Sequence, residues 1–457
     1  MKKSILNIML CTVVALPFTA CSTTDDQEDA DAKKLAALTE VITEGMQNSD
    51  EVVALTAKAK TATAADTRGA IESDEVTKVF ETPKDYLGIM MLAQNILLDN
   101  IKDYPEYQPY NSLKVNWNSP KADPKNPSQL FDDTWSVPLR NTPAQALKID
   151  DDNDGTMDRT YIELNTEAKN KYYPMGAYHN YWFYGYGPRQ ESLMVSPEGD
   201  EFSVLFNNLD GSQDVIYGKA DPAYNHVSEA YSARWFRYAD NRTNDVSNPV
   251  NMSYEHKMMQ IRFNIKAGGL PVDESVDINK LYEPAYNTRI VSIQIINAPQ
   301  SMQLILANNN KAMASREGMF VPAEGAARDR KYTVLNIGDS FYPQPTNPAA
   351  QKGDADNIPA VTQAGEGLLL PVLDDYNNNP YLMRIVLEYP KNSGIKHELK
   401  VPMRLPIETG AKLEAGKIYD VILEIFAPEE INSNTTLKPW VESTTQPFIG
   451  NGVFPVH

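Results

Sequence analysis

Cysteine is almost absent from this chain of 457 residues, whose two cysteines, Cys11 and Cys21, both lie near the N-terminus. The body that follows therefore has no disulfide, no thiolate nucleophile and no cysteine-based metal site. Any chemistry of the folded part must depend on other side chains.

Basic residues are also scarce relative to acids. The chain has 42 Lys and Arg against 61 Asp and Glu, a formal net charge of -19. Nucleic-acid binding needs a basic face, so we expect no nucleic-acid partner. The histidines are scattered, and the sequence has no Gly-x-Ser-x-Gly elbow, Walker loop or GxGxxG motif before a helix. We therefore expect that the protein is not an enzyme.

The N-terminus has the pattern of an export signal. Lys2 and Lys3 precede the apolar run Ile5–Phe18, and the small residues Thr19 and Ala20 lead to Cys21. The sequence predicts a signal peptide over residues 1–20 and a bacterial lipobox, with Cys21 lipidated and placed on a membrane. The alternative is an ordinary signal peptide in which the cysteine occurs by chance.

Residues 21–68 predict a lipidated tether and propeptide. An acidic polar stretch is followed by an Ala-, Lys- and Thr-rich segment, in which Val52, Val53 and Leu55 could belong to a short helix or to a strand. Arg68 lies among small polar residues, where a trypsin-like protease could bind an extended chain. We therefore name Arg68 as a candidate processing site.

The rest of the chain predicts a mainly all-β fold with few short helices. Prolines outnumber glycines, 31 to 23, and short apolar runs are bounded by turn residues. The helix-length pattern Tyr86–Ile101 is the one helix we consider there. The clearest predicted strands are Phe202–Phe206, Met258–Ile265, Arg289–Ile296, Leu368–Leu373, Leu382–Tyr389 and Ile418–Phe426.

Two of these segments alternate between apolar and polar residues. Gln260–Lys266 does so strictly and Tyr419–Ile425 similarly, which is typical of antiparallel sheets with one buried face. The polar stretch Asp221–Asn251 predicts a junction between two domains, at residues 69–245 and 246–457.

An acidic loop is the best candidate for a metal site. Asp150, Asp152, Asp154 and Asp158 stand at positions 1, 3, 5 and 9, with Gly155 at position 6. This spacing turns alternate carboxylates inward, as structural Ca²⁺ requires, and the carbonyl of Thr156 would add a ligand. Tyr161 occupies the place of the usual bidentate Glu, and both flanks predict strands. We expect a calcium-stapled hairpin, against the alternative of a solvated acidic turn.

The segment Tyr172–Gly187 is dense in aromatic residues. They could form a platform for stacking sugars, or alternate rings could face the core of a sandwich, which we favour. His256 we interpret as a structural hydrogen-bonding residue.

Several short motifs, in their order along the chain, resemble the fimbrillins of Bacteroidales, which are type V pilus subunits. The resemblance covers about residues 70 to 442 and follows the lipobox. The motifs are Tyr172-Tyr173-Pro174, Tyr181–Pro188, Gln213–Ala220, Tyr254–Met258, Gly365–Pro371, Ala415–Tyr419 and the isolated Trp440.

This resemblance implies two transthyretin-like antiparallel β-sandwich domains and a protein exported to the outer membrane as a lipoprotein. A trypsin-like maturation protease would cut after a basic residue, Arg68 or its rivals Lys58 and Lys60. Loss of the first strand would open a groove that a strand of an identical or related pilin subunit fills, building an extracellular fimbrium that supports adhesion. Main-chain hydrogen bonds and alternating side chains would hold that strand.

The C-terminal tail is the candidate for the incoming strand. Between Thr444 and Val456, prolines and glycines interrupt a set of apolar residues that could enter a groove or cap their own domain. That set is Phe448, Ile449, Val453, Phe454 and Val456. A monomeric, membrane-anchored lipoprotein that binds surface glycans is the alternative function.

Overall fold

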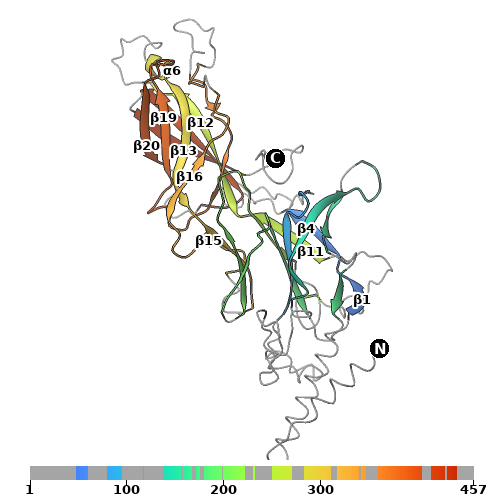
Figure 1. Cartoon of the computed structure of the whole chain (residues 1–457). Coiled ribbons are helices and arrows are strands. Elements are labelled where there is room, and N and C mark those ends of the chain that lie inside the picture. Colours follow the sequence, from blue (N-terminus) through green and yellow to red (C-terminus); the bar gives the residue numbers. More distant parts are fainter. Residues whose placement is uncertain are drawn as a thin grey trace, which may run out of the picture.

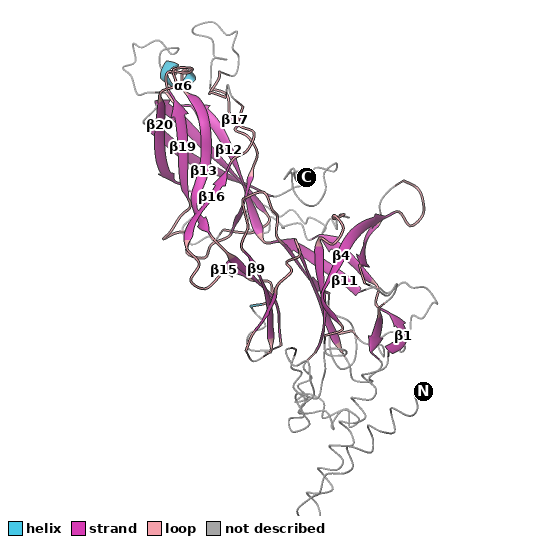
Figure 2. Cartoon of the chain, in the orientation of Figure 1, coloured by secondary structure: helices cyan, strands magenta, loops and turns pink. Residues whose placement is uncertain are grey.

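The structure is a computed structural model, and strands dominate the part of the chain that it describes, as Figure 2 shows. This confirms the predicted all-β fold. The one helix in the described residues is the single turn α6 (Glu283–Tyr286), and none there is long and apolar enough to cross a membrane. The described residues are 48–59, 80–94, 117, 137–155, 158–166, 171–174, 180–197, 199–221, 230–231, 250–269, 282–309, 316–338, 341–345, 359–403, 413–427 and 430–439.

The first sheet closes on itself as a barrel in the order β10-β11-β2-β5-β4-β3-β7. The ring closes because β7 pairs β10 while β2 joins β11 to β5. The strands are β2 (Leu55–Ala59), β3 (Leu87–Ala93), β4 (Leu139–Ile149), β5 (Arg159–Leu164), β7 (Tyr181–Gly187), β10 (Ile216–Ala220) and β11 (Val250–His256).

The interior of the barrel is packed with aromatic and aliphatic side chains. Tyr254 leans across Gly185 and Gly218, which face each other on β7 and β10. A Cβ at Gly185 would lie 2.0 Å from the Tyr254 hydroxyl oxygen, so glycine is required for this ring to fit. Phe80 meets the same ring edge-on, with centroids 5.6 Å apart.

Two further sheets make up the upper part of the molecule in Figure 1. Their alternating buried residues belong to one hydrophobic cluster, so the sheets share a core. One sheet contains β12 (Met258–Ala267), β17 (Thr362–Gln363), β18 (Leu368–Pro371), β21 (Lys417–Ala427) and β22 (Glu430–Pro439). The other contains β13 (Arg289–Pro299), β16 (Arg328–Thr333), β19 (Leu382–Glu388) and β20 (Lys396–Pro402).

The six strands predicted most clearly are confirmed as β9 (Glu201–Phe206), β12, β13, β18, β19 and β21. The alternation along β12 is confirmed by its burial pattern, but its pairing with β21 is parallel, as is that of β2 with β11. Arg262 and Asp420 stand opposite each other in the β12–β21 register and form two bonds, of 2.7 and 2.9 Å. An alternating pattern reports one buried face, and it does not report strand direction.

The helix expected over Tyr86–Ile101 is wrong in its described part, where Leu87–Ala93 is strand β3. Every residue of β3 is buried, because strands flank it on both sides and both its faces are covered. A continuous apolar run of this kind has no period by which strand and helix could be distinguished.

A fourth sheet joins the two halves of the chain. It contains β8 (Leu193–Val195) and β9 (Glu201–Phe206) from the first half, with β14 (Met302–Asn308) and β15 (Phe320–Pro322) from the second. The chain passes from the barrel to the next sheet at Lys257, between β11 and β12. The division at residues 245 and 246 into separate domains stays a prediction.

Candidate functional site

Strand β2 occupies an interior position in the barrel, although it comes from the segment predicted to be a removable propeptide. It pairs parallel with β11 from Leu55↔Val250 to Ala59↔Tyr254 and antiparallel with β5 from Leu55↔Ile162 to Ala57↔Thr160. Both of its edges are therefore hydrogen-bonded. Of the two alternatives for the segment around Leu55, the structure has the strand.

The inner side of β2 is apolar. Leu55 is 1% exposed, and Val53, just before the strand, is also buried. Both belong to the main hydrophobic cluster, against which Ala57 packs as well. An alternation of apolar side chains on one face is what a strand needs to fill a slot between two neighbours.

The outer side of β2 is polar, with Thr56 buried at 6% exposure and Lys58 part-exposed, and it makes two side-chain contacts with nearby residues. Thr56 Oγ1 donates to Asn251 Oδ1 at 2.5 Å, and Lys58 Nζ lies 3.0 Å from Asp221 Oδ2. The Lys58 and Asp221 side chains are 34% and 39% exposed. Sequence reasoning did not identify Asn251 and Asp221, because only the strand pairing brings them to this segment.

The chain before β2 is also bound to the body. Strand β1 (Asn48–Val52) pairs antiparallel with β6 (Tyr172–Pro174), and the Val53 N–H donates to the Lys171 carbonyl at 2.7 Å. The described residues 48–59 thus make two strand contacts in succession, first with β6 and then within the barrel.

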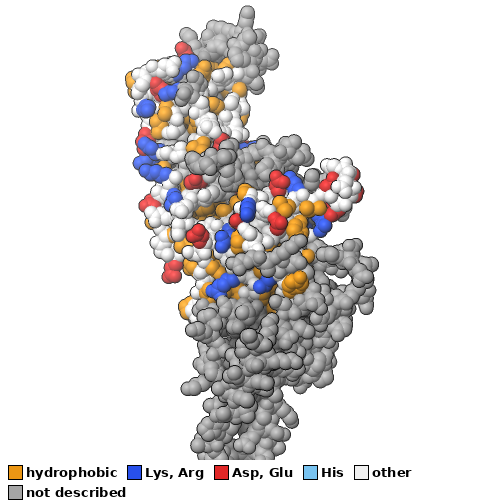
Figure 3. All heavy atoms as spheres, turned by 45° about the vertical axis from the view of Figure 1, so that its right-hand side comes forward, with side chains coloured by type: hydrophobic (Ala, Val, Ile, Leu, Met, Phe, Trp, Pro, Cys, Tyr) orange, Lys and Arg blue, Asp and Glu red, His pale blue; other side chains and the backbone are white. Residues whose placement is uncertain are grey.

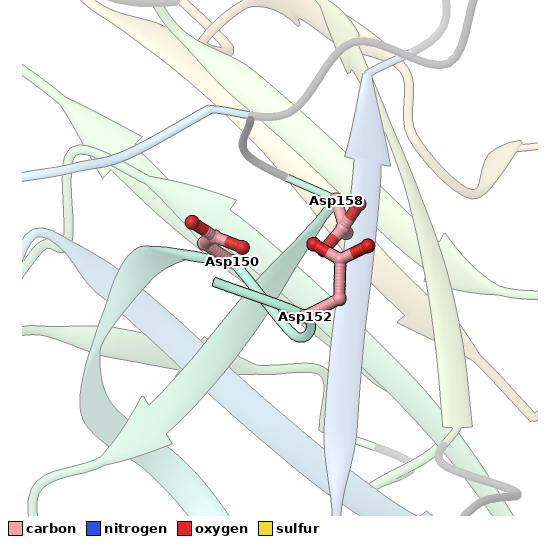
Figure 4. A group of neighbouring side chains, drawn as sticks. All are labelled: Asp150, Asp152 and Asp158. Carbon is pink, nitrogen blue, oxygen red and sulfur yellow. The ribbon is translucent and has the colours of Figure 1, made fainter. Parts of the chain in front are cut away.

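The acidic loop connects β4 to β5, which pair antiparallel, so the predicted hairpin is confirmed. Figure 4 shows that Asp150, Asp152 and Asp158 gather at its turn, and one carboxylate oxygen of each lies within 4.8 Å of the others. Such spacing suits oxygens around a common cation. Asp154 is not in this group, and Thr156 lies outside the described residues.

Backbone donors and one arginine hold the turn. The N–H of Gly155 donates to Asp150 at 2.8 Å, and that of Asp151 donates to Asp158 at 2.7 Å. Gly155 has φ +90°, a conformation that glycine adopts at little cost. Arg159 pairs with Asp151 through two bonds of 2.6 and 2.8 Å, and this hydrogen bonding lowers the pKa of Asp151. Asp151 thus faces Arg159, while the other three carboxylates gather separately.

In its described residues, 172–174 and 180–187, the aromatic stretch faces mainly inward. Of β7 only Trp182 is partly exposed, and the Lys219 ammonium lies over its ring at 4.9 Å from the centroid. The hydroxyl of Tyr184 donates to Glu317 at 2.8 Å, and burial, followed by the nearby Glu317 charge, raises the pKa of that phenol. These contacts favour the packing interpretation of the stretch over an open platform for sugars.

His256 forms a buried polar pair. Its Nδ1 lies 2.6 Å from Asp214 Oδ2, and the two side chains are 7% and 1% exposed. The Tyr86 hydroxyl donates to the Asp214 carbonyl at 3.0 Å. The predicted hydrogen-bonding role of His256 is confirmed.

Several predicted site residues lie outside the described residues, and their roles stay predictions. They are the lipidation residue Cys21, the processing residues Lys60 and Arg68, and the tail set Phe448, Ile449, Val453, Phe454 and Val456.

On the face drawn in Figure 3, the described residues show no large field of one charge. In Figure 3, acidic and basic side chains are interspersed over the upper part of the molecule. Strand β20, which forms an edge of its sheet, has exposed Lys396, Glu398 and Lys400 on one side. Charges on an edge strand discourage indiscriminate pairing with other chains.

No protein-family model matches the sequence, and no curated protein does so at a significant level. Solved structures do show similarity. A proposed cell adhesion protein from Bacteroides uniformis is 14% identical, with a TM-score of 0.37 over 86% of this chain and 100% of its own. One from Bacteroides ovatus is 10% identical, with a TM-score of 0.39 over 86% and 99%. The tip fimbrial protein Mfa3 from Porphyromonas gingivalis is 9% identical, with a TM-score of 0.31 over 85% and 99%.

Proposed function

We propose that this chain is a structural subunit of a cell-surface fimbria that assembles by strand exchange. In this proposal it is exported as a lipoprotein on Cys21 and cut by a trypsin-like protease after Arg68. One observation carries the proposal: β2, which precedes the cut, lies between β11 and β5 and closes the barrel.

Removal of β2 would have a direct physical consequence. The facing edges of β11 and β5 would lose their partner, and the core around Leu55 would be open to water. Unpaired backbone groups and exposed apolar surface are both costly, and an incoming extended segment repairs them together. The segment removed by cleavage thus lies where an incoming strand could replace it, between β11 and β5.

The position of Lys58 argues against Lys58 as the processing site. Lys58 lies inside β2, where it stands opposite Ser253 of β11 and pairs with Asp221. A protease binds its substrate as an accessible extended chain, and a strand within a sheet is protected from it. Cleavage at Arg68 would instead leave β2 whole.

The mature protein on the cell surface tests this proposal. N-terminal sequencing should give Gly69, and the protein should run as a heat-resistant ladder on a gel. Replacing Arg68 by Ala should leave the precursor uncut and abolish the ladder, while Lys58→Ala leaves processing unchanged. A surface form that begins at Cys21 and never polymerises would contradict the proposal.

The C-terminal tail is our candidate for the donor strand. A variant that ends at Ser443 lacks all five apolar residues of the tail set. We expect it to be exported and cut normally and to fail as a donor. If the truncated chain joins neighbouring subunits in the fimbria as well as the full chain does, the donor strand that this chain supplies to its neighbour lies elsewhere.

We also propose that the acidic loop binds Ca²⁺ as a structural ion. The gathered oxygens of Asp150, Asp152 and Asp158 support this, since a hard cation prefers carboxylate oxygens from one tight turn. The ion would neutralise charges that otherwise repel one another and would stiffen the β4–β5 hairpin.

A further inference from the structure

The outer face of β2 offers a way to distinguish one incoming strand from another. The main-chain hydrogen bonds of β2 to β11 and β5 do not depend on sequence, and the inner face of β2 requires only apolar residues. Thr56 and Lys58, by contrast, meet particular polar partners at 2.5 and 3.0 Å. Sequence selection can therefore reside in these two outer contacts.

The acidic partner of Lys58 is set in place by residues other than those of β2. Asp221 Oδ1 accepts a 2.8 Å bond from the Ser253 hydroxyl, and the Asp221 N–H donates to the Asn251 carbonyl at 2.8 Å. The Tyr231 hydroxyl donates to the Asp221 carbonyl at 3.0 Å. The carboxylate would thus stay beside the slot when β2 leaves.

We propose that Asp221, with Asn251, selects the strand that replaces β2. This inference depends on the proposed strand exchange. The preferred segment has an apolar residue at the place of Leu55, a hydroxyl or amide at that of Thr56, and Lys or Arg at that of Lys58. A part-exposed ion pair adds little stability, but a wrong charge facing Asp221 is penalised, so the pair acts on choice of partner.

The chain's own tail does not fit this requirement. The segment from Thr444 to His457 contains no Lys and no Arg. A second copy that donated this tail segment would therefore place no permanently charged cation beside Asp221. The occupant that fits is a basic strand from a different, related subunit, so this chain meets a partner of another kind at this groove.

Peptide exchange tests the selection. The full chain, with one engineered protease site at Arg68, is cut once and mixed with an excess of a fluorescent peptide that copies Asn48–Lys60. Matched peptides have Lys58→Arg or Lys58→Glu, and a further peptide copies the tail Thr444–His457. Incorporation is measured by fluorescence anisotropy after removal of free peptide.

We expect the Lys and Arg peptides to enter equally and the Glu and tail peptides to enter at least about tenfold less well. The chain variant Asp221→Lys should reverse the order of Lys and Glu peptides. Asp221→Asn, which can keep the Ser253 bond, should abolish the difference. If the Lys and Glu peptides enter the parent chain equally well, Asp221 does not select the strand, although strand exchange still occurs. The same conclusion follows if the tail peptide enters as well as the Lys peptide. Entry of no peptide overturns both.

Discussion

Shortening Leu55 tests whether β2 is an integral part of the folded unit. The side chain is 1% exposed and belongs to the main hydrophobic cluster. Leu→Ala at buried sites costs about 2 to 5 kcal/mol, the larger values arising where neighbours cannot close the cavity. Because β11 and β5 hold β2 on both edges, we expect Leu55→Ala to lower the free energy of unfolding of the full chain by about 3 kcal/mol.

Urea denaturation of the uncut chain measures this cost. The matched control is Leu335→Ala, since Leu335 is 53% exposed and its change should stay within about 0.5 kcal/mol. In the chain cut at Arg68, the same loss should weaken retention of the N-terminal fragment roughly a hundredfold. A cost for Leu55→Ala no larger than that for Leu335→Ala would refute the reasoning that β2 is a packed strand.

Three further changes test other parts of the structure. Replacing Asp150 and Asp152 together by Ala should abolish Ca²⁺ binding in calorimetry, and a chelator should lower the melting temperature of the parent alone. Gly185→Ala should cost about 1 to 3 kcal/mol in urea denaturation, because its Cβ would collide with the buried Tyr254 hydroxyl. Burial raises the pKa of the Tyr254 phenol above its ordinary value near 10. The folding stability that this group contributes should therefore be fully present below pH 10 and be lost as the pH rises above it. Phenolate absorbance of the folded protein measures whether Tyr254 keeps its proton there.

Each of these changes has a control within the chain. Asp374→Ala removes an exposed acid and should leave Ca²⁺ binding intact. Gly338→Ala adds a Cβ with no atom within 4 Å and should be nearly neutral. Tyr254→Phe should reduce the loss of stability above pH 10. The calcium argument is contradicted if a chelator lowers the melting temperature of the double variant. The packing argument is contradicted if Gly185→Ala leaves the free energy of unfolding unchanged. The pKa argument is contradicted if the Tyr254 phenol titrates near pH 10 in the folded protein.

Local patterns predicted much of the fold. The strict alternation of apolar and polar residues along Gln260–Lys266 predicted a strand with one buried face. The spacing of the acidic residues and glycine in Asp150–Asp158 predicted a turn. Leu87–Ala93 was mistaken for part of a helix because a strand covered on both faces has no alternation. Alternation of apolar and polar residues shows which face of a strand is buried, but a strand buried on both faces has no such alternation.

The candidate site was less accessible to sequence reasoning. Thr56 and Asn251 bond to each other across a separation of 195 positions, and no local pattern links them. The parallel pairing of β2 with β11 also needs a long return of the chain. Long-range pairing is decided by which strands complete a common core, so Asp221 and Asn251 emerged only from the folded structure.

The sheet shared by the two halves of the chain has a mechanical consequence. Strand β14 pairs with β9 from Met302↔Phe206 to Asn308↔Glu201, and the Tyr217 hydroxyl donates to the Leu306 carbonyl at 3.0 Å. The halves cannot swing apart without breaking this ladder and the contacts beside it. A pulling force applied to one half is therefore transmitted to the other through the β9–β14 ladder as well as through the chain itself.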